Sequence, residues 1–351
     1  MKKLLSSAFA CALLVGLVSG CSSDDTDPIS TTTGPVKIDT LKVAFVPSRE
    51  PAEIITATAP LKEMLIAELA KAGYALSDVE ISVGTTYEAV GESLDAGSVD
   101  VGFIPGGTYV LYDEGAEVIL ASTRAGLSID SPEAKVWNDE KPTTAVDTQV
   151  SFYRALVIAG PSAKGQELCN TVNSGTELTW DDLDAANWAV MSSTSSAGYI
   201  YPTLWLLDSY QKSVSDLTRS AQSDSYGTSF ARLASGQVDL LTVYADGRRD
   251  YEDKWTAEYS RTASIWDETC IVGVTDKIFN DTVSVSKSSA TLNNNPGFKE
   301  AIAQALINIG NTPEGKEVVK IYAHEGYAPA TSADYDPARK AQKVIQEMQN
   351  A

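Results

Sequence analysis

The sequence contains one short pattern twice, and this repeat restricts the possible folds more than any other feature. Tyrosine is followed at fixed spacing by leucine, glycine, valine and aspartate, in the frame Tyr-x6-Leu-x2-Gly-x-Val-Asp, beginning at Tyr87 and again at Tyr226. The end of a helix explains Leu-x-x-Gly in either copy alone, but explains less well why all matches fall at one offset. We therefore expect the same structural unit to be built twice.

Segments of strand and helix character alternate through both halves of the chain. The stretches from Leu41 to Val46 and from Val79 to Val83 have the composition of strands, and Pro60 opens a segment with one apolar helical face. Such alternation predicts mostly parallel sheets covered by helices on both faces. Two facing units of this kind place their strand ends at a shared cleft. The sequence therefore predicts a two-lobed α/β protein with one ligand cleft between the lobes.

The expected lobe boundaries follow from apolar strands in the middle of the chain. We expect residues 41–150 and 270–351 to form lobe 1, and residues 151–269 to form lobe 2. The chain would cross between the lobes near residues 150–156 and return near residues 266–272. Two crossings of this kind form a hinge.

The N-terminal end has the pattern of an export signal. A basic start is followed by an apolar stretch that is too short to span a bilayer, and then by Cys21. This arrangement resembles a lipoprotein signal, which implies removal of residues 1–20 and lipidation of Cys21 at the extracytoplasmic face of the cell membrane. An ordinary secretory signal is the alternative, and either one exports the chain. Residues 21–40 are rich in Ser, Thr and Asp, which predicts a disordered tether.

Charge and cysteine content exclude several classes of partner. The chain has 27 Lys and Arg against 47 Asp and Glu, a formal net charge of −20. Such a surface repels nucleic acid and anionic lipid, so we expect membrane attachment only through Cys21. Cys169 and Cys270 remain after export, and two thiols in an oxidising compartment favour a disulfide over two separately buried thiols. Neither lies in a C-x-x-C pattern, so neither a metal site nor a cofactor is expected.

A run of hydroxyl side chains lies where a strand is expected to end and a helix to begin. The run extends from Ser192 to Ser196 and is followed by Gly198 and Pro202. The first turn of a helix has unpaired N–H groups and a partial positive charge, so it attracts an anion, and the hydroxyls add further donors. A plain N-cap in a polar loop is the alternative.

An enzymatic function has no support in the sequence. A nucleophile needs an activating base or a metal ion, and the sole histidine, His324, has no triad or metal partner at a recognisable spacing. The motifs G-x-S-x-G and His-Glu-x-x-His are absent as well. We therefore expect a binding protein rather than a catalyst.

The combined pattern resembles the substrate-binding proteins of ABC-type phosphonate, phosphite and phosphate importers. The matching segments are Val46-Pro47-Ser48, Thr86-Tyr87, Ala96-Gly97-Ser98-Val99-Asp100-Val101, Phe152-Tyr153-Arg154-Ala155, Ser193-Thr194-Ser195, Gly198-Tyr199-Ile200-Tyr201-Pro202, His324-Glu325-Gly326-Tyr327 and Asp334-Tyr335-Asp336-Pro337-x-Arg339. The resemblance implies a type II periplasmic-binding-protein fold and a monomer that delivers a small phosphorus oxyanion to an ABC permease. A membrane-anchored sensor or adhesion module, and a binder of another anion such as a sulfonate, are the alternatives.

The resemblance also implies a set of ligand contacts. The phosphonyl oxygens would be held by hydroxyls and helix N–H groups at Ser193, Thr194, Ser195 and Ser196, with phenolic hydrogen bonds from Tyr87, Tyr153 and Tyr226. This sequence has two residues more than the family's short Ser-Thr-Ser-Gly form, so the resemblance leaves open which of these hydroxyls touch the ligand. Asp246 would face a ligand amine or a protonated anion, since an ionised carboxylate repels a dianion. Alternatively, the Asp246 side chain bonds to its own turn.

Overall fold

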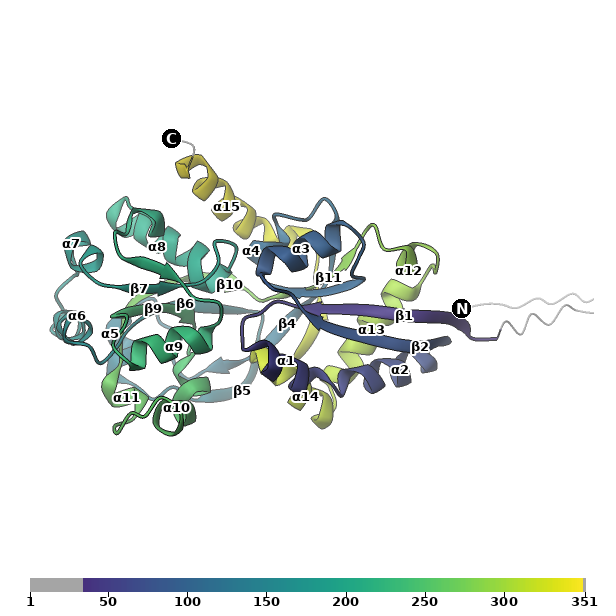
Figure 1. Ribbon diagram of the computed structural model, residues 1–351, viewed down its shortest axis with the longest axis horizontal. Helices are drawn as coiled ribbons and strands as arrows, with labels where there is room; N and C mark the ends of the chain where they lie inside the picture. Colours follow the sequence, from purple (N-terminus) through teal and green to yellow (C-terminus); the bar gives the residue numbers. More distant parts are fainter. Residues whose placement is uncertain (1–33, 350–351) are drawn as a thin grey trace, which may run out of the picture. The chain divides into compact units, whose positions relative to one another are not determined.

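The computed structural model describes residues 34–349, and within them it contains two β-sheets flanked by helices (Figure 1). The predicted α/β architecture with two sheets is therefore confirmed. The predicted signal peptide and the lipidation site Cys21 lie outside the described residues, as does most of the predicted tether. No helix among the described residues is long and apolar enough to cross a bilayer.

The first sheet has seven strands, and they include the first and the last strand of the described chain. Its strands are β1 (Val36–Phe45), β2 (Tyr74–Val83), β3 (Val101–Ile104), β4 (Ala116–Leu127), β5 (Ala145–Val150), β11 (Thr282–Ser286) and β12 (Gly326–Pro329). They are ordered β12-β4-β11-β3-β1-β2, and β5 pairs with β4. The surrounding helices are α1 (Pro51–Thr58), α2 (Leu61–Lys71), α3 (Tyr87–Asp95), α4 (Gly106–Tyr109), α12 (Ala290–Asn293), α13 (Phe298–Gly310), α14 (Pro313–Val319) and η3 (Lys320–Tyr322).

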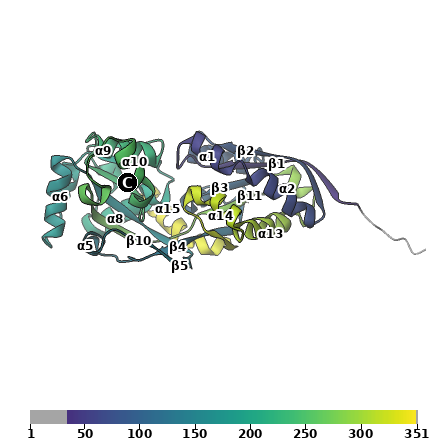
Figure 2. The same ribbon diagram turned by 90° about the horizontal axis from the view of Figure 1, so that it is seen from below.

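The second sheet has five strands from the middle of the chain. They are β6 (Phe152–Ala159), β7 (Trp188–Val190), β8 (Ser220–Gln222), β9 (Leu240–Tyr244) and β10 (Cys270–Phe279), in the order β10-β6-β9-β7-β8. The surrounding helices are α5 (Ala134–Asp139), α6 (Ala163–Asn173), α7 (Trp180–Asp184), η1 (Ser196–Ile200), α8 (Tyr201–Tyr210), η2 (Val214–Asp216), α9 (Tyr226–Ala234), α10 (Arg248–Ala257) and α11 (Ile265–Glu268). After η4 (Ser332–Tyr335), the last helix α15 (Asp336–Gln349) contacts both α4 and α8. Figure 2 shows α15 between the elements of the two sheets.

Only part of each sheet is parallel, which corrects the expectation of mostly parallel sheets. β1 is parallel to β2 and β3, and β7 is parallel to β8 and β9. The other pairs are antiparallel: β11 with β3 and β4, β12 with β4, β4 with β5, and β6 with β9 and β10. For the pairs of β6 and β11, the reason is that each of these strands enters its sheet from the other sheet, and so runs against the strands it joins.

The central strands of the first sheet are buried on both faces and are apolar at consecutive positions. In β1, Val43 and Phe45 pack into the cluster that includes α2 and α13, whereas Ala44 packs into the cluster that includes α3. Figure 1 shows α3 on one face of this sheet and α2 on the other. Helices that cover both faces leave the ends of the strands as the open positions for a ligand.

The two copies of the repeat fold alike. Each copy forms a helix, α3 or α9, with tyrosine as its first residue and a capping hydroxyl just before it. Gly97 and Gly236 follow these helices with φ of 72° and 73°, a left-handed conformation that glycine adopts without steric cost. The repeated Tyr-to-Gly spacing is therefore the length of one short capped helix.

The aspartates of the repeat anchor the strands that follow. The Asp100 carboxylate accepts the backbone N–H of Lys42 at 2.8 Å, and the Asp239 carboxylate accepts that of Asn187 at 2.7 Å. Each aspartate thus connects the strand after its helix to the neighbouring parallel segment. Because both helices start at the inner ends of the sheets, Tyr87 and Tyr226 are brought to a common region.

Two further features connect distant parts of the chain. Cys169 in α6 and Cys270 in β10 form a disulfide, which confirms the predicted bridge.

The two connections between the sheets lie side by side, because the Asn280 side-chain amide donates to the carbonyl oxygens of Ser122 and Val150, each at 2.9 Å. The Asn280 N–H also donates to the Ser151 carbonyl at 2.9 Å. Asn280 therefore joins both crossings where the chain changes sheet.

Candidate functional site

A cavity of about 40 Å³ lies between the two sheets, at the inner ends of their strands. Hydroxyl groups, two arginines, one carboxylate and one imidazole make up its polar lining. These residues are Ser48, Arg49, Tyr87, Arg124, Tyr153, Ser195, Ser196, Tyr226, Tyr244, Asp281, Tyr322 and His324. Its apolar lining is Val46, Phe103, Ile104, Pro105 and Ala197. Donors are therefore concentrated in a small space that both sheets enclose.

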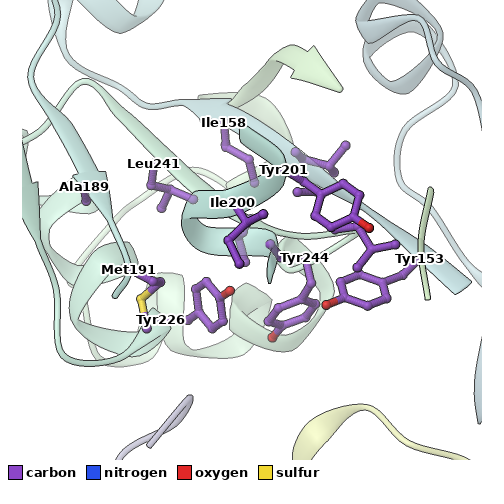
Figure 3. Packing of buried hydrophobic residues seen from close by; sticks show 14 of the residues in the cluster. Tyr153, Ile158, Ala189, Met191, Ile200, Tyr201, Tyr226, Leu241 and Tyr244 are labelled. Atoms are coloured by element: carbon purple, nitrogen blue, oxygen red, sulfur yellow. The ribbon is translucent and has the colours of Figure 1, made fainter. Parts of the chain in front are cut away.

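Five of the residues singled out in the sequence line this cavity together. They are Tyr87, Tyr153, Ser195, Ser196 and Tyr226. The hydroxyls of Ser195 and Tyr226 lie 3.3 Å apart. Figure 3 shows the rings of Tyr226, Tyr244 and Tyr153 next to one another, and the first two pack edge to face at 5.1 Å.

Burial fixes the protonation state of these phenols. It raises the pKa of Tyr87, Tyr153 and Tyr226 above the ordinary value for tyrosine. The three hydroxyls are therefore protonated at neutral pH and can donate hydrogen bonds to an anion.

The Ser195–Ser196 segment is the start of a helix, as the sequence predicts. Ser195 is the N-cap of η1, a π-helical turn that continues into α8, and its Oγ accepts the N–H of Gly198 at 3.2 Å. The N–H groups of a first helical turn have no acceptor within the helix. Two of these N–H groups belong to Ser196 and Ala197, and both residues line the cavity.

The other two residues of the predicted hydroxyl set do not line the cavity. Ser193 is exposed, and Thr194 is buried with its hydroxyl donating to Glu88 of α3 at 3.0 Å. The Ser192 hydroxyl donates to the same Glu88 oxygen, and the Gly107 N–H donates to Ser196 Oγ at 3.0 Å. This part of the run therefore joins the second sheet's elements to those of the first.

Further contacts close the opposite side of the cavity. Arg49, after β1, pairs with Asp250 of α10 at 2.6 Å, and Ser225 donates to Glu50 at 2.5 Å. With the Glu88 contacts, these bonds hold the elements of the two sheets together around the cavity.

Asp246 lies outside the cavity lining and is already fully engaged. Its Oδ1 accepts the Arg248 backbone N–H at 3.1 Å and Nε at 2.9 Å, and its Oδ2 accepts Nη2 at 2.7 Å and the Thr143 hydroxyl at 3.0 Å. Both charged side chains are fully buried. The carboxylate that lines the cavity is instead that of Asp281.

Arg124, Asp281 and His324 form a cluster of ionisable side chains at the cavity that the sequence did not reveal. Arg124 Nη2 donates to Asp281 Oδ2 at 3.0 Å, and His324 Nε2 lies 3.4 Å from the same oxygen. The Arg124 guanidinium also lies 4.3 Å from the centre of the Tyr153 ring, a cation–π contact. These residues come from β4, the crossing before β11 and the segment before β12, so no sequence spacing connects them.

Two facing α/β units, joined by two crossings around one donor-rich cavity, define a two-lobed periplasmic binding protein. The family of periplasmic substrate-binding proteins of phosphonate ABC transporters matches residues 43–335, and the chain belongs to this family. It is accordingly the extracytoplasmic binding component of an importer rather than an enzyme, and its partners are a small anion and the ABC permease.

Solved structures share this fold at low sequence identity. A binding component of an ABC phosphonate transporter from Pseudomonas aeruginosa has a TM-score of 0.59 and 14% identity, covering 88% of this chain and 87% of that chain. PhnD1 from Prochlorococcus marinus in complex with methylphosphonate has a TM-score of 0.60 and 14% identity, covering 88% of this chain and 98% of that chain. A Xanthomonas citri protein bound to ATP has a TM-score of 0.60 and 13% identity, covering 89% and 98%.

Proposed function

We propose that this protein captures a small phosphorus oxyanion in the cavity between its sheets and presents it to the permease from a lipid-anchored position. A phosphonate, phosphite or phosphate ester fits this role. The observation that carries the proposal is the convergence of Ser195, Ser196 and Tyr226 from the second sheet's elements with Tyr87 from the first sheet's. Neutral donors and free helix N–H groups stabilise an anion at such a position.

The size of the cavity supports a small ligand. A single water needs roughly 10 to 15 Å³ of such space, so a cavity of about 40 Å³ holds about three waters. One tetrahedral oxyanion with a short substituent is of this order, whereas a nucleotide is far larger. Three or four hydrogen bonds to a charged ligand, each about 1.5 to 3 kcal/mol, suffice for binding at micromolar concentration or below after association costs.

We further propose that binding is coupled to closure of two lobes. The first lobe would comprise the strands up to Val150 and those from Thr282 onward, and the second the strands from Phe152 to Phe279. The hinge would lie at the paired crossings around Asn280. The contacts of Glu88 with Ser192 and Thr194 would form when the anion docks and the lobes meet.

Substitution of single donors tests the site. Ser195→Ala and Tyr87→Phe each remove one hydroxyl from the cavity, and we expect each to weaken methylphosphonate binding by about 10- to 100-fold. Calorimetric titration measures the dissociation constant, and a melting curve shows that each variant folds. Ser193→Ala is the matched control, since Ser193 is exposed and outside the cavity. Wild-type affinity in both site variants would remove these residues from the ligand site.

The lipid anchor is tested separately from the ligand. We expect Cys21→Ser to shift the exported protein from the detergent-rich to the aqueous phase in a detergent partition experiment, because two or more acyl chains are needed for stable membrane attachment. Ser22→Ala is the control and should partition like the wild type. Partition of the Cys21→Ser variant into the detergent-rich phase would contradict lipidation at this residue.

A further inference from the structure

Unpaired polar groups gather around the second crossing between the sheets. Among the described residues, buried side-chain atoms without a hydrogen-bond partner include Ser122 Oγ, Arg124 Nε, Asn280 Oδ1 and His324 Nδ1. All four residues adjoin Asp281: the Arg124 and His324 side chains contact its carboxylate, its backbone carbonyl accepts the Ser122 N–H at 2.9 Å, and Asn280 precedes it in the chain. A buried polar group without a partner costs about 1 to 3 kcal/mol. Arg124 and His324 line the cavity, so a ligand or a bound water in the cavity can supply the partners that these two side chains lack.

Asp281 also has an oxygen available to a ligand. Arg124 and His324 both contact Oδ2, whereas Oδ1 has no hydrogen-bond partner among the described residues. The Asp281 side chain is 21% exposed, against 9% for Arg124 and 3% for His324, and it lines the cavity. Asp281 Oδ1 is therefore a free acceptor in a site otherwise rich in donors.

The charges around the cavity define what this acceptor can contact. Burial raises the pKa of Asp281, but the hydrogen bond from His324 and the positive charge of Arg124 outweigh it and hold that pKa below the usual value. Burial lowers the pKa of His324, so its imidazole is neutral near pH 7. Arg49 is balanced by Asp250. An anion in the cavity therefore meets the Arg124 guanidinium and the ionised Asp281 carboxylate together.

We propose that Asp281 makes the site selective for a phosphorus oxyanion that carries one proton. The P–OH group donates to Asp281 Oδ1, while the P–O⁻ oxygens accept from Arg124 and from the Ser195–Ser196 segment. A dianion presents a bare oxygen to the carboxylate and is repelled. An aminoalkyl ligand offers a proton as well, but its arm exceeds a space of about three waters. This inference rests on the proposed function and names the protonation state of its ligand.

Methylphosphonate and methanesulfonate separate this selectivity from general anion binding. Both are tetrahedral and carry a methyl group, but the sulfonate is a monoanion with no proton to donate. We expect wild-type protein to bind methanesulfonate at least about 100-fold more weakly than methylphosphonate at acidic pH. In a series from about pH 5.5 to about pH 8.5, affinity for methylphosphonate should stay constant while the ligand keeps its second proton. Above the pKa of that proton it should fall about tenfold per pH unit.

The Asp281→Asn variant provides a second test of this selectivity, because its side-chain amide can donate a hydrogen bond to an unprotonated oxygen. We expect the two ligands to bind this variant within about threefold of each other, with the pH dependence lost, while Asp276→Asn, at an exposed position, keeps wild-type selectivity. Wild-type protein that binds methanesulfonate as tightly as methylphosphonate, or binds methylphosphonate equally at all pH values, would overturn this inference and leave the proposed function standing. Binding of neither ligand would overturn the proposed function itself.

Discussion

Replacement of Asp246 by alanine is expected to destabilise the protein by about 3 to 5 kcal/mol, the largest effect of any single substitution considered. Asp246 and Arg248 are fully buried and joined by two side-chain hydrogen bonds at 2.7 and 2.9 Å. Removal of the carboxylate leaves the guanidinium as an uncompensated buried charge. Packing of Arg248 on the Trp266 ring, at 4.6 Å, keeps it in place. Denaturant unfolding measures the loss.

A double variant distinguishes the buried charge from loss of packing. Asp246→Ala combined with Arg248→Met removes both charges, so its destabilisation should be smaller than that of Asp246→Ala alone. A loss below about 1 kcal/mol for the single variant would contradict a tight buried pair.

Because Asp246 lies outside the cavity, Asp246→Asn should leave the ranking of phosphonate, phosphite and aminoalkyl ligands unchanged. A changed ranking would return Asp246 to the ligand site.

Removal of the disulfide is the second large effect. Cys169 and Cys270 are separated by 101 residues, so the bond closes most of the second sheet and its helices into one loop. Loop-closure entropy for such a length is about 4.7 kcal/mol, and measured losses fall at about 2 to 5 kcal/mol. The Cys169→Ala/Cys270→Ala variant should therefore unfold at lower denaturant concentration.

Reductant provides the matched control for the disulfide. It should destabilise the wild type by a similar amount and leave the double variant unaffected. Equal stability of the oxidised wild type and the double variant would show that the bridge contributes nothing. Ligand affinity should change little, because neither cysteine lines the cavity.

The sequence revealed the site residues whose positions depend on local structure. The repeat singled out Tyr87 and Tyr226 as equivalent positions, and the family resemblance gave them a ligand contact. Each starts a capped helix of the same length, and equivalent helices bring their first residues to the same cavity. Ser195 and Ser196 could be found because a hydroxyl run before an apolar segment marks a helix start. In both cases the decisive interaction spans only a few residues of sequence.

Residues whose positions depend on long-range pairing could not be found in this way. Arg124 and Asp281 are brought together because β4 pairs with β11 and the chain crosses between the sheets beside it. The spacing of Arg124 and Asp281 in the sequence does not predict this contact. At Asp246 the alternative of a side chain bonded to its own turn is borne out, since the carboxylate accepts the Arg248 backbone N–H. The bidentate contact with the buried Arg248 side chain was not predicted. The antiparallel pairing of β6 and β11 was missed for the same reason, because the crossings set the direction of these two strands.

A crystal structure of the protein with methylphosphonate tests the central claim most directly. The proposed function predicts the phosphonyl group in the cavity between the sheets, with its oxygens within hydrogen-bond distance of the Ser195–Ser196 segment and of Tyr87. A phosphonyl group bound elsewhere, with Ser195, Ser196 and Tyr87 out of contact, would contradict it.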